Sequence, residues 1–266
     1  MISKNQIEII GVQDIPFIKE GDNISKIIIE SLKKNNMSLK DKDVIIISQS
    51  IISKSNGRIR NLNVIVPSKK AIEIYKQMKP KAERAGIPLK PPELIQAILE
   101  ESKEILKVEH VLIVETKHQG FICANAGIDK SNVEGINNVT LLPENPDEDA
   151  RRIRKEFKEL SNKEVAVIVS DSFGRPFRVG TVGVAIGIAG MKPILDKRGC
   201  MDLYGYKLQT TIIGQADNLV SAAQLVMGES NEGIPVVIIR GYDYNIEEHA
   251  SITSILREDK FDIFRS

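Results

Sequence analysis

Residues Val165–Met191, VAVIVSDSFGRPFRVGTVGVAIGIAGM, are the stretch that decides how this chain folds. It opens with the apolar, β-branched run Val165–Val169, which predicts a buried strand. The polar residues Ser170–Ser172 follow directly, and open α/β sheets place their ligands at the carboxyl ends of strands. Arg175 and Arg178 come next, and guanidinium groups suit phosphate and carboxylate oxygens. The same pattern is equally typical of a strand, a polar turn and a glycine-rich packed segment.

The composition is that of an ordinary globular protein. The 266 residues are 42% hydrophobic and 27% charged, and a chain of this length can bury a large core. Because the formal net charge is only +1, the protein as a whole has no electrostatic field that would attract nucleic acid or anionic lipid. Any anion-binding site must therefore be local. The N-terminus lacks a signal-peptide core, and the longest apolar run, Val182–Met191, is too short to span a bilayer. Cys123 and Cys200 form no metal or disulfide pattern, which predicts reduced, packed thiols in a cytoplasmic protein.

Apolar periodicity predicts alternating strands and helices along the chain. Strands are expected at Ile7–Ile10, Asp43–Ser48, Val111–Glu115, Leu208–Gly214 and Pro235–Arg240. Helices are expected after an N-cap at Asp22 or Asn23, from Asn145-Pro146 towards Leu160, and over Ser68–Lys79, Pro92–Leu106, Asp217–Met227 and Glu247–Leu256. This order predicts an α/β fold of the mixed α+β type, with several short antiparallel pieces.

Three segments between these elements admit two interpretations each. Asn56-Gly57 is a strong hairpin-turn signal, and the neighbouring Lys54 and Arg58 are either solvated charges or phosphate contacts. The loop Ile15-Pro16-Phe17-Ile18 either covers the core or forms an apolar wall for a flat ring. The proline-rich basic residues 79–93 predict a surface linker, with an internal boundary or lid near residues 80–92 as the alternative.

Oxygen donors gather around three parts of the chain. Carboxylate, hydroxyl and amide oxygens without a histidine or cysteine cluster favour Mg²⁺ or Mn²⁺ over zinc, although the first group is also typical of a simple Asx turn. Together with cations for phosphate, this set is typical of phosphoryl transfer, and no P-loop motif is present. The donors are Asp129, Asn132, Asp171, Ser172, Gln224, Glu229 and Glu232, and the cations are Lys54, Arg175 and Arg178.

Five motifs, in this order, resemble one known family. They are ANAGIDKSN (Ala124–Asn132), SDSFGRPFRVGTVGVAIGIAG (Ser170–Gly190), DLYG (Asp202–Gly205), AAQLVMGE (Ala222–Glu229) and IPVVIIRG (Ile234–Gly241). The chain resembles the coenzyme F420-0:L-glutamate ligases (F420 gamma-glutamyl ligases) in their archaeal single-domain form. The resemblance covers essentially the whole chain. It implies one ligase domain over residues 1–266, without the flavin-reductase-like C-terminal extension of the fused bacterial form.

The resemblance implies a GTP-dependent ligase that joins L-glutamate to the lactyl carboxylate of F420-0, giving F420-1. A second glutamate is then added through the γ-carboxylate of the first, giving F420-2. The implied route transfers the γ-phosphate of GTP to the acceptor carboxylate, and the glutamate amine displaces phosphate from this acyl phosphate. The resemblance also implies a mixed α/β two-part fold, an intertwined homodimer and two Mg²⁺ or Mn²⁺ ions per site, with room for K⁺ as an additional ion.

By matched position, the resemblance assigns one metal to Asp129 and Asp171, and the other to Ser172 with an oxygen from Gln224 or Glu229. Arg175 and Arg178 join the two aspartates as the expected catalytic residues. The guanine nucleotide is expected to contact Ile15, Pro16, Phe17, Ile18, Gln49, Lys54, Asn132, Gln224, Leu225, Val226, Met227, Gly228, Glu229, Ser230 and Asn231. The sequence departs from the family at Ser172, Ser50 and Asn56, where threonine, lysine and glutamate are usual; Ser172 keeps the hydroxyl.

Two other functions also fit these residues. One is a related amide-bond ligase with a different carboxylate acceptor, because a fold does not fix the substrate. The other is a non-catalytic guanine-nucleotide-binding protein, which predicts lost metal ligands. A nucleic-acid partner is not expected, because the chain has 5% aromatic residues, no tryptophan and no basic stripe. For the expected homodimer, the small residues of Val182–Met191 suit close packing across a subunit interface.

Overall fold

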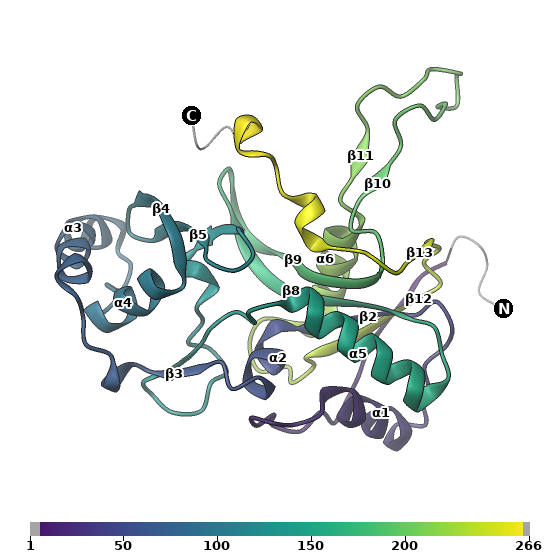
Figure 1. Ribbon diagram of the computed structural model, residues 1–266, viewed down its shortest axis with the longest axis horizontal. Coiled ribbons are helices and arrows are strands. Elements are labelled where there is room, and N and C mark those ends of the chain that lie inside the picture. Colours follow the sequence, from purple (N-terminus) through teal and green to yellow (C-terminus); the bar gives the residue numbers. More distant parts are fainter. Residues whose placement is uncertain (1–5, 263–266) are drawn as a thin grey trace.

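The structure is a computed structural model and describes residues 6–262. Figure 1 shows a main lobe, residues 6–58 and 141–262, beside a small lobe, residues 59–140. An arm, residues 195–213, projects from the main lobe and begins and ends with the paired strands β10 (Leu195–Asp196) and β11 (Ile212–Ile213). Sheets and helices of both lobes confirm the mixed α+β class.

The main lobe is built on a six-stranded sheet in the order β1-β12-β2-β8-β9-β13. The central strands β2 and β8 run parallel, and the other neighbours run antiparallel. The apolar runs of β2 and β12, and Ala166–Val169 of β8, are fully buried, as expected for continuous apolar runs covered on both faces. The strand bounds are β1 Glu8–Gly11, β2 Val44–Ser48, β8 Ala166–Arg175, β9 Arg178–Met191, β12 Val236–Arg240 and β13 Ile246–Glu247.

Strand β8 does not end where the sequence indicated. The predicted strand Val165–Val169 is present, but the polar turn that the sequence offered as an alternative is not, because Ser170–Ser172 continue the strand to Arg175 and pair with β9. Burial is complete only as far as Ser170, and beyond it the two strands leave the core as an increasingly exposed ribbon. The antiparallel partner β9 provides backbone partners for this polar segment, so the strand can extend past the end of the apolar run.

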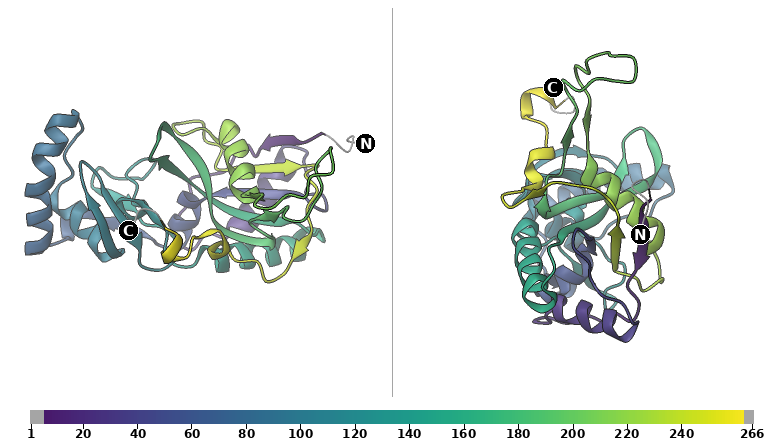
Figure 2. Two further views of the ribbon diagram at one scale, coloured as in Figure 1. Left: turned by 90° about the horizontal axis from the view of Figure 1, so that it is seen from above. Right: turned by 90° about the vertical axis from the view of Figure 1, so that its right-hand side faces the viewer.

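Helices cover both faces of the main sheet. Helix α5 (Pro146–Ser161), with α1 (Ile24–Lys34) beside it, lies on one face, and α6 (Gln215–Met227) lies on the other (Figure 2). Two expected N-caps are confirmed. The side chain of Asn23 accepts a hydrogen bond from the backbone of Lys26, and Asn145 accepts one from Glu148.

Small residues of β9 let these helices approach the sheet closely. A Cβ atom at Gly187 would lie 2.5 Å from the carbonyl oxygen of Pro146 in α5. A Cβ atom at Gly183 would lie 2.9 Å from the carbonyl oxygen of Val220 in α6. The small residues therefore pack within their own chain, which corrects the expectation that they pack across a subunit interface.

The small lobe has cores of its own. A ribbon of β3 (Ile59–Asn61) and β7 (Asn138–Thr140) joins it to the main lobe. Its sheet contains β4 (Ser102–Val108), β5 (Leu112–Thr116) and β6 (Ile122–Ala124), and its helices are α3 (Lys69–Ala85) and α4 (Pro92–Glu100), with 3₁₀ turns at Leu62–Val64 and Asn125–Gly127. The expected helix Pro92–Leu106 is therefore wrong after Glu100, because pairing with β5 makes residues 102–108 a strand. Residues 86–91 connect α3 to α4, which pack against each other.

Three further expectations need correction. Asn56-Gly57 is no hairpin turn, because α2 (Gln49–Ser55) ends there with Asn56 as C-cap and Gly57 at a φ of +67°. The expected final helix is replaced by β13 and the 3₁₀ turns Ile252–Ile255 and Asp259–Phe261, and the strand expected at residues 208–214 shrinks to β11. Of the two free thiols, Cys123 is buried, but Cys200 is exposed on the arm and is not packed.

None of the helices within residues 6–262 combines the length and the apolar composition that crossing a bilayer requires.

We predict that Gly187→Ala destabilises the protein. Its Cβ would overlap the Pro146 backbone at 2.5 Å, and overpacking of this kind costs about 1–3 kcal/mol in the free energy of unfolding. Gly174→Ala is the matched control on the other strand of the same hairpin, because no atom of residues 6–262 lies within 4 Å of a Cβ there. Denaturation by urea gives both values. Equal stability of the two variants would contradict the close approach of α5.

Candidate active site at the lobe junction

Asp171 lies where β8 leaves the core. Ser170, just before it, is buried and donates its hydroxyl to the backbone carbonyl of Ile47 at 3.2 Å, which ties the strand to β2. The Asp171 carboxylate accepts a hydrogen bond from the Ser172 amide at 2.8 Å. The next residue, Ser172, pairs with Gly183 on β9. The carboxylate and the hydroxyl are thus carried on rigid, extended backbone.

Asp129 lies on the small lobe, across the lobe junction from Asp171. Its backbone forms an isolated bridge with Thr140, with hydrogen bonds of 2.8 and 3.1 Å in the two directions. Its carboxylate accepts from the backbone amide of Ser131 at 2.8 Å and from the Ser131 hydroxyl at 2.5 Å. The Asx-type turn that the sequence left open is therefore present, and it holds the carboxylate in a defined position.

Three separate segments meet beside Asp129. Lys54, near the end of α2, donates to the backbone carbonyl of Asn132 at 2.7 Å. The Asn132 side chain donates in turn to the carbonyl of Ser230 at 3.0 Å, in the loop after α6. Lys54, Asn132 and Ser230, far apart in the sequence, thus form one connected group.

The end of α6 adds further oxygen donors. The amide of Gln224 donates to the Glu229 carboxylate, which folds the loop back onto the helix. Glu232 accepts from the Ser230 amide at 2.8 Å, and its carboxylate lies against Gly228, where a Cβ atom would collide with it. Position 228 therefore favours glycine for two reasons: a side chain would collide with Glu232, and the backbone φ of +69° is one that other residues rarely adopt.

The carboxylates repel one another across the lobe junction. Burial, together with the negative charges of Asp129 and Glu229, raises the pKa of Asp171 to about 7, although the Ser172 amide hydrogen bond opposes the shift. Burial lowers the pKa of Lys54, while the Asp129 charge partly restores it. We call Asp129, Asp171 and Glu229 the acidic cluster. Perturbed titration of this kind is enriched at functional sites.

The donor chemistry fits a hard divalent cation. Within residues 6–262 no three histidine, cysteine, aspartate or glutamate side chains converge to form a complete metal site. Mg²⁺, however, usually keeps several waters and needs only one or two protein carboxylates together with substrate phosphates. A cation between Asp129 and Asp171 would replace their repulsion with attraction.

The other expected site residues lie elsewhere or face inward. Ile18 is buried and Ile15 packs on the core, whereas Pro16 and Phe17 are exposed, so half of this loop covers the core. Gln49 is buried and accepts from Ser53 at 2.9 Å. Arg175 and Arg178 face each other at the exposed tip of the β8–β9 ribbon, where Arg175 donates to the Val179 carbonyl. In the last turn of α6, Leu225 is exposed while Val226 and Met227 pack on the core, and Asn231 is exposed in the loop after the helix.

Arg58 is neither a solvated charge nor free for phosphate, which corrects both interpretations. It forms ion pairs with Glu101 at 2.6 Å and Glu144 at 3.0 Å. Glu101 is 43 residues away along the chain, so no local sequence signal could have found this contact.

Two surface hollows lie outside the acidic cluster. One, of about 330 Å³, is lined by Lys81, Arg84, Ala85, Glu109 and His110 in the small lobe. The other, of about 170 Å³, lies at the start of α5 beside His118 and Thr253. Neither contains a residue that the sequence assigned to the site.

Comparison with known proteins decides the family. Residues 13–241 match the model of the family described as F420-0:Gamma-glutamyl ligase. The chain belongs to this family. Its relatives include proteins named coenzyme F420:L-glutamate ligase from Methanothermobacter thermautotrophicus, Methanocaldococcus jannaschii and Archaeoglobus fulgidus. They are 46%, 43% and 41% identical to it, and each alignment covers at least 97% of both chains.

Membership of the F420-0:Gamma-glutamyl ligase family confirms the expectation of a ligase. The family match includes the segments that carry Lys54, Asp129, Asp171 and Glu229. The residues that meet at the lobe junction therefore lie within the part of the chain that the family shares.

We predict that Asp171→Asn stabilises the protein at high pH in metal-free buffer. The pKa of about 7 in the folded protein lies above the ordinary value of about 4, so the folded state binds this proton more tightly than the unfolded state. The free energy of unfolding of the native protein should therefore fall as the pH rises from about 4 to about 7, and then level off. Asparagine cannot ionise, so the variant should melt a few degrees higher at pH 8.

This difference should disappear below about pH 3, where the native carboxyl is protonated in both states. The control is Asp243→Asn, whose side chain is 93% exposed in a surface ion pair, and it should leave the melting temperature almost unchanged at either pH. Melting curves of Asp171→Asn and the native protein that coincide at pH 8 would contradict the raised pKa that burial and the neighbouring carboxylates give Asp171.

Proposed function

We propose that this chain is a GTP-dependent ligase that attaches L-glutamate to coenzyme F420-0, giving F420-1, and adds a second by γ-linkage, giving F420-2. One observation carries the proposal. Lys54, Asp129, Asn132 and Asp171 meet at the lobe junction of a chain whose relatives, named coenzyme F420:L-glutamate ligase, are 41–46% identical over nearly its full length. In this proposal the enzyme works in the cytoplasm on small molecules.

The connected group beside Asp129 is proposed to hold the guanine nucleotide. Lys54 supplies a positive charge for phosphate oxygens, and its depressed pKa reflects partial burial beside the acidic cluster. Asn132 and the loop after α6, already hydrogen-bonded to each other, offer amide and carbonyl groups to a polar ring edge. The exposed Phe17, with Pro16, offers an apolar surface to the ring.

Divalent cations are proposed to bind the acidic cluster: one on Asp129 and Asp171, and one on Ser172 with Gln224 or Glu229. When bound, Mg²⁺ or Mn²⁺ neutralises charge on the phosphates and polarises the bond that breaks. The carboxylates of this chain fix where that charge is compensated. The strand that carries Asp171 and the turn that carries Asp129 are both held by backbone hydrogen bonds, so little reorganisation is needed on binding.

The proposed reaction has two balanced steps. In the first, a carboxylate oxygen of the acceptor attacks the γ-phosphorus of GTP, the bond to the β-phosphate oxygen breaks, and an acyl phosphate and GDP result. In the second, the glutamate amine attacks the acyl carbon, the carbon–oxygen bond to phosphate breaks, and inorganic phosphate and an amide form. The amine gives up a proton to solvent or to a carboxylate.

Arg175 and Arg178 are proposed to bind the anionic part of a substrate. A strand rises about 3.3 Å per residue, so Arg175 lies about 13 Å along the ribbon from Asp171. A group that contacts both must be long, or the arginines act in the site of a second subunit. Their forked guanidinium groups suit carboxylate and phosphate oxygens at that distance from the acidic cluster.

We predict that GTP, but not ATP, supports turnover. The chain is incubated with Mg²⁺, F420-0 and L-glutamate, and the mass of the product reports the glutamates added. Equal rates with ATP would contradict the guanine assignment and leave the ligase intact. A native protein that makes no product from F420-0, but releases phosphate with another carboxylate acceptor, would favour the related amide-bond ligase. GTP binding without any turnover would favour a non-catalytic binding protein.

In the same assay Asp129→Asn should lower the rate at least about a hundredfold, the magnitude typical of losing one group that stabilises transition-state charge. The control is the exposed Asp243→Asn, which should turn over normally. A melting curve shows whether each variant is folded. If Asp129→Asn is folded and as active as the control, Asp129 merely forms its turn.

We propose that the protein is a homodimer and that the arm contacts the second copy of the chain. Its tip exposes Met201, Leu203 and Tyr204, the last two almost completely. The tip is nevertheless preformed, because Asp202 accepts hydrogen bonds from the amides of Tyr204 and Tyr206 at 2.8 Å each. An ordered apolar surface that projects into water is typical of a protein contact. A second copy of the chain is the occupant that we propose.

We predict a mass of two chains by light scattering at micromolar concentration. Leu203→Glu should give one chain's mass, because a charge at a buried apolar contact is costly, while the melting of the monomer should change little at a 99% exposed position. Val66→Glu, at an 85% exposed apolar position of the small lobe, is the control and should remain dimeric. A native protein with the mass of one chain would contradict the dimer.

A further inference from the structure

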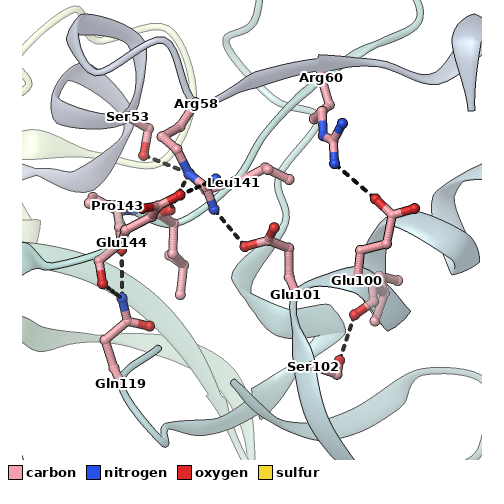
Figure 3. Close-up of polar contacts among 12 residues, drawn as sticks. Ser53, Arg58, Arg60, Glu100, Glu101, Ser102, Gln119, Leu141, Pro143 and Glu144 are labelled. Atoms are coloured by element: carbon pink, nitrogen blue, oxygen red, sulfur yellow. Dashed lines mark hydrogen bonds and ion pairs between the residues drawn. The ribbon is translucent and has the colours of Figure 1, made fainter. Parts of the chain in front are cut away.

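Two separate segments hold the Arg58 side chain at the lobe junction (Figure 3). Its Nε donates to the carbonyl of Leu142 at 3.1 Å, its Nη1 contacts Glu144 at 3.0 Å and its Nη2 contacts Glu101 at 2.6 Å. Only 18% of the arginine side chain and 14% of the Glu101 side chain are exposed. A guanidinium group in fixed geometry with several acceptors holds its partners more firmly than a flexible surface pair.

These contacts join the two lobes. Arg58 is the last residue of the main lobe before the chain enters the small lobe, and Glu101 is the C-cap of α4 in the small lobe. Glu144 belongs to the connection that leads from the small lobe back to α5. Gln119, in the small lobe, contacts the same connection: its side-chain amide donates to the carbonyls of Pro143 and Glu144 at 2.6 and 2.7 Å.

The chain passes between the lobes twice, after Arg58 and before Leu141, and these two segments are hydrogen-bonded to each other. The amide of Leu141, on the returning crossing, donates to the carbonyl of Arg58 at 3.0 Å. The carbonyl of Leu141 accepts from the Ser53 hydroxyl at 2.7 Å. Both polar groups of the Leu141 backbone are thus held by the end of α2 and the turn that contains Arg58.

These contacts are connected to the acidic cluster through the backbone of Thr140. Thr140, which precedes Leu141, is the residue whose backbone pairs with Asp129 in both directions. Asp129 belongs to the small lobe and Asp171 to the main lobe, so the distance between the two carboxylates depends on how the lobes sit together. The ion pair of Arg58 with Glu101 is a mostly buried charged contact between the two lobes.

We infer that Arg58 is a positioning residue that, through the contacts of its side chain with Glu101 and Leu142, fixes the spacing of Asp129 and Asp171 for a divalent cation. This inference rests on the metal site of the proposed function. Arg58 touches neither aspartate. Partners that orient metal ligands commonly change metal affinity by 10- to 100-fold when they are removed.

A matched control lies two residues further along. Arg60 pairs with Glu100 at 2.8 Å and also joins β3 to α4, as Figure 3 shows. Its side chain is 47% exposed and that of Glu100 is 39% exposed. Exposed pairs contribute little, and both residues of this pair belong to the small lobe, so the contact does not fix one lobe against the other.

The experiment is a titration of the full chain with Mn²⁺ alone, with free Mn²⁺ measured by electron paramagnetic resonance. Arg58→Met should weaken binding about tenfold or more, and Arg60→Met should stay within about twofold of the native protein. Arg58→Lys keeps the positive charge but loses the fork, so its affinity should lie between those of Arg58→Met and the native protein. Melting curves identify the folded variants.

Each outcome decides something different. Native protein that binds no Mn²⁺ overturns the metal site and the positioning with it. Native binding that is matched by a folded Arg58→Met overturns the positioning alone. If Arg58→Met does not fold, Glu101→Gln decides, because it keeps the volume of the partner and removes its charge. Weakened Mn²⁺ binding by Glu101→Gln supports the inference, and unchanged binding overturns it.

Discussion

The pairing of β8 with β9 is the constraint on which the rest of this structure depends. On one side β8 runs parallel to β2 in the core, and on the other it pairs with β9 beyond the end of its own apolar run. A polar segment rarely continues a buried strand alone, because its backbone groups would need water. Here β9 provides those partners, so Asp171 and Ser172 lie on ordered backbone at the edge of the core. Helices α5 and α6 then hold β9 from both faces through its glycines.

A second constraint is electrostatic. Burying the carboxylate of Asp171, and placing it near those of Asp129 and Glu229, costs free energy, as the raised pKa of Asp171 indicates. A large apolar core and firm backbone hydrogen bonds offset this cost. An unfavourable electrostatic interaction of this kind, in a fold whose other interactions are favourable, is expected at a functional site. The lobe junction is where it concentrates, since one aspartate comes from each lobe.

Local signals predicted much of the main lobe and less of the small one. The strands β2, β8 and β12 are continuous apolar runs, and α1 and α5 begin at the asparagine caps that the sequence displays. In the small lobe, residues 102–108 carry apolar positions that also suit a helix, and only their pairing with β5 makes them a strand. Asn56-Gly57 suits both a hairpin and a helix end, and the contacts of α2 decided between them.

The sequence by itself determined the family, the order of the central elements and the residue types available to a phosphate or a cation. It could do so because motifs, apolar runs and helix caps are local patterns. Only the tertiary structure decided which of those residues meet. Lys54, Asn132 and Ser230 are joined by hydrogen bonds across many residues of chain, whereas Arg175 and Arg178 are carried away along the ribbon. The role of Arg58 was likewise hidden, because its partners Glu101 and Glu144 come close to it only when the two lobes pack together.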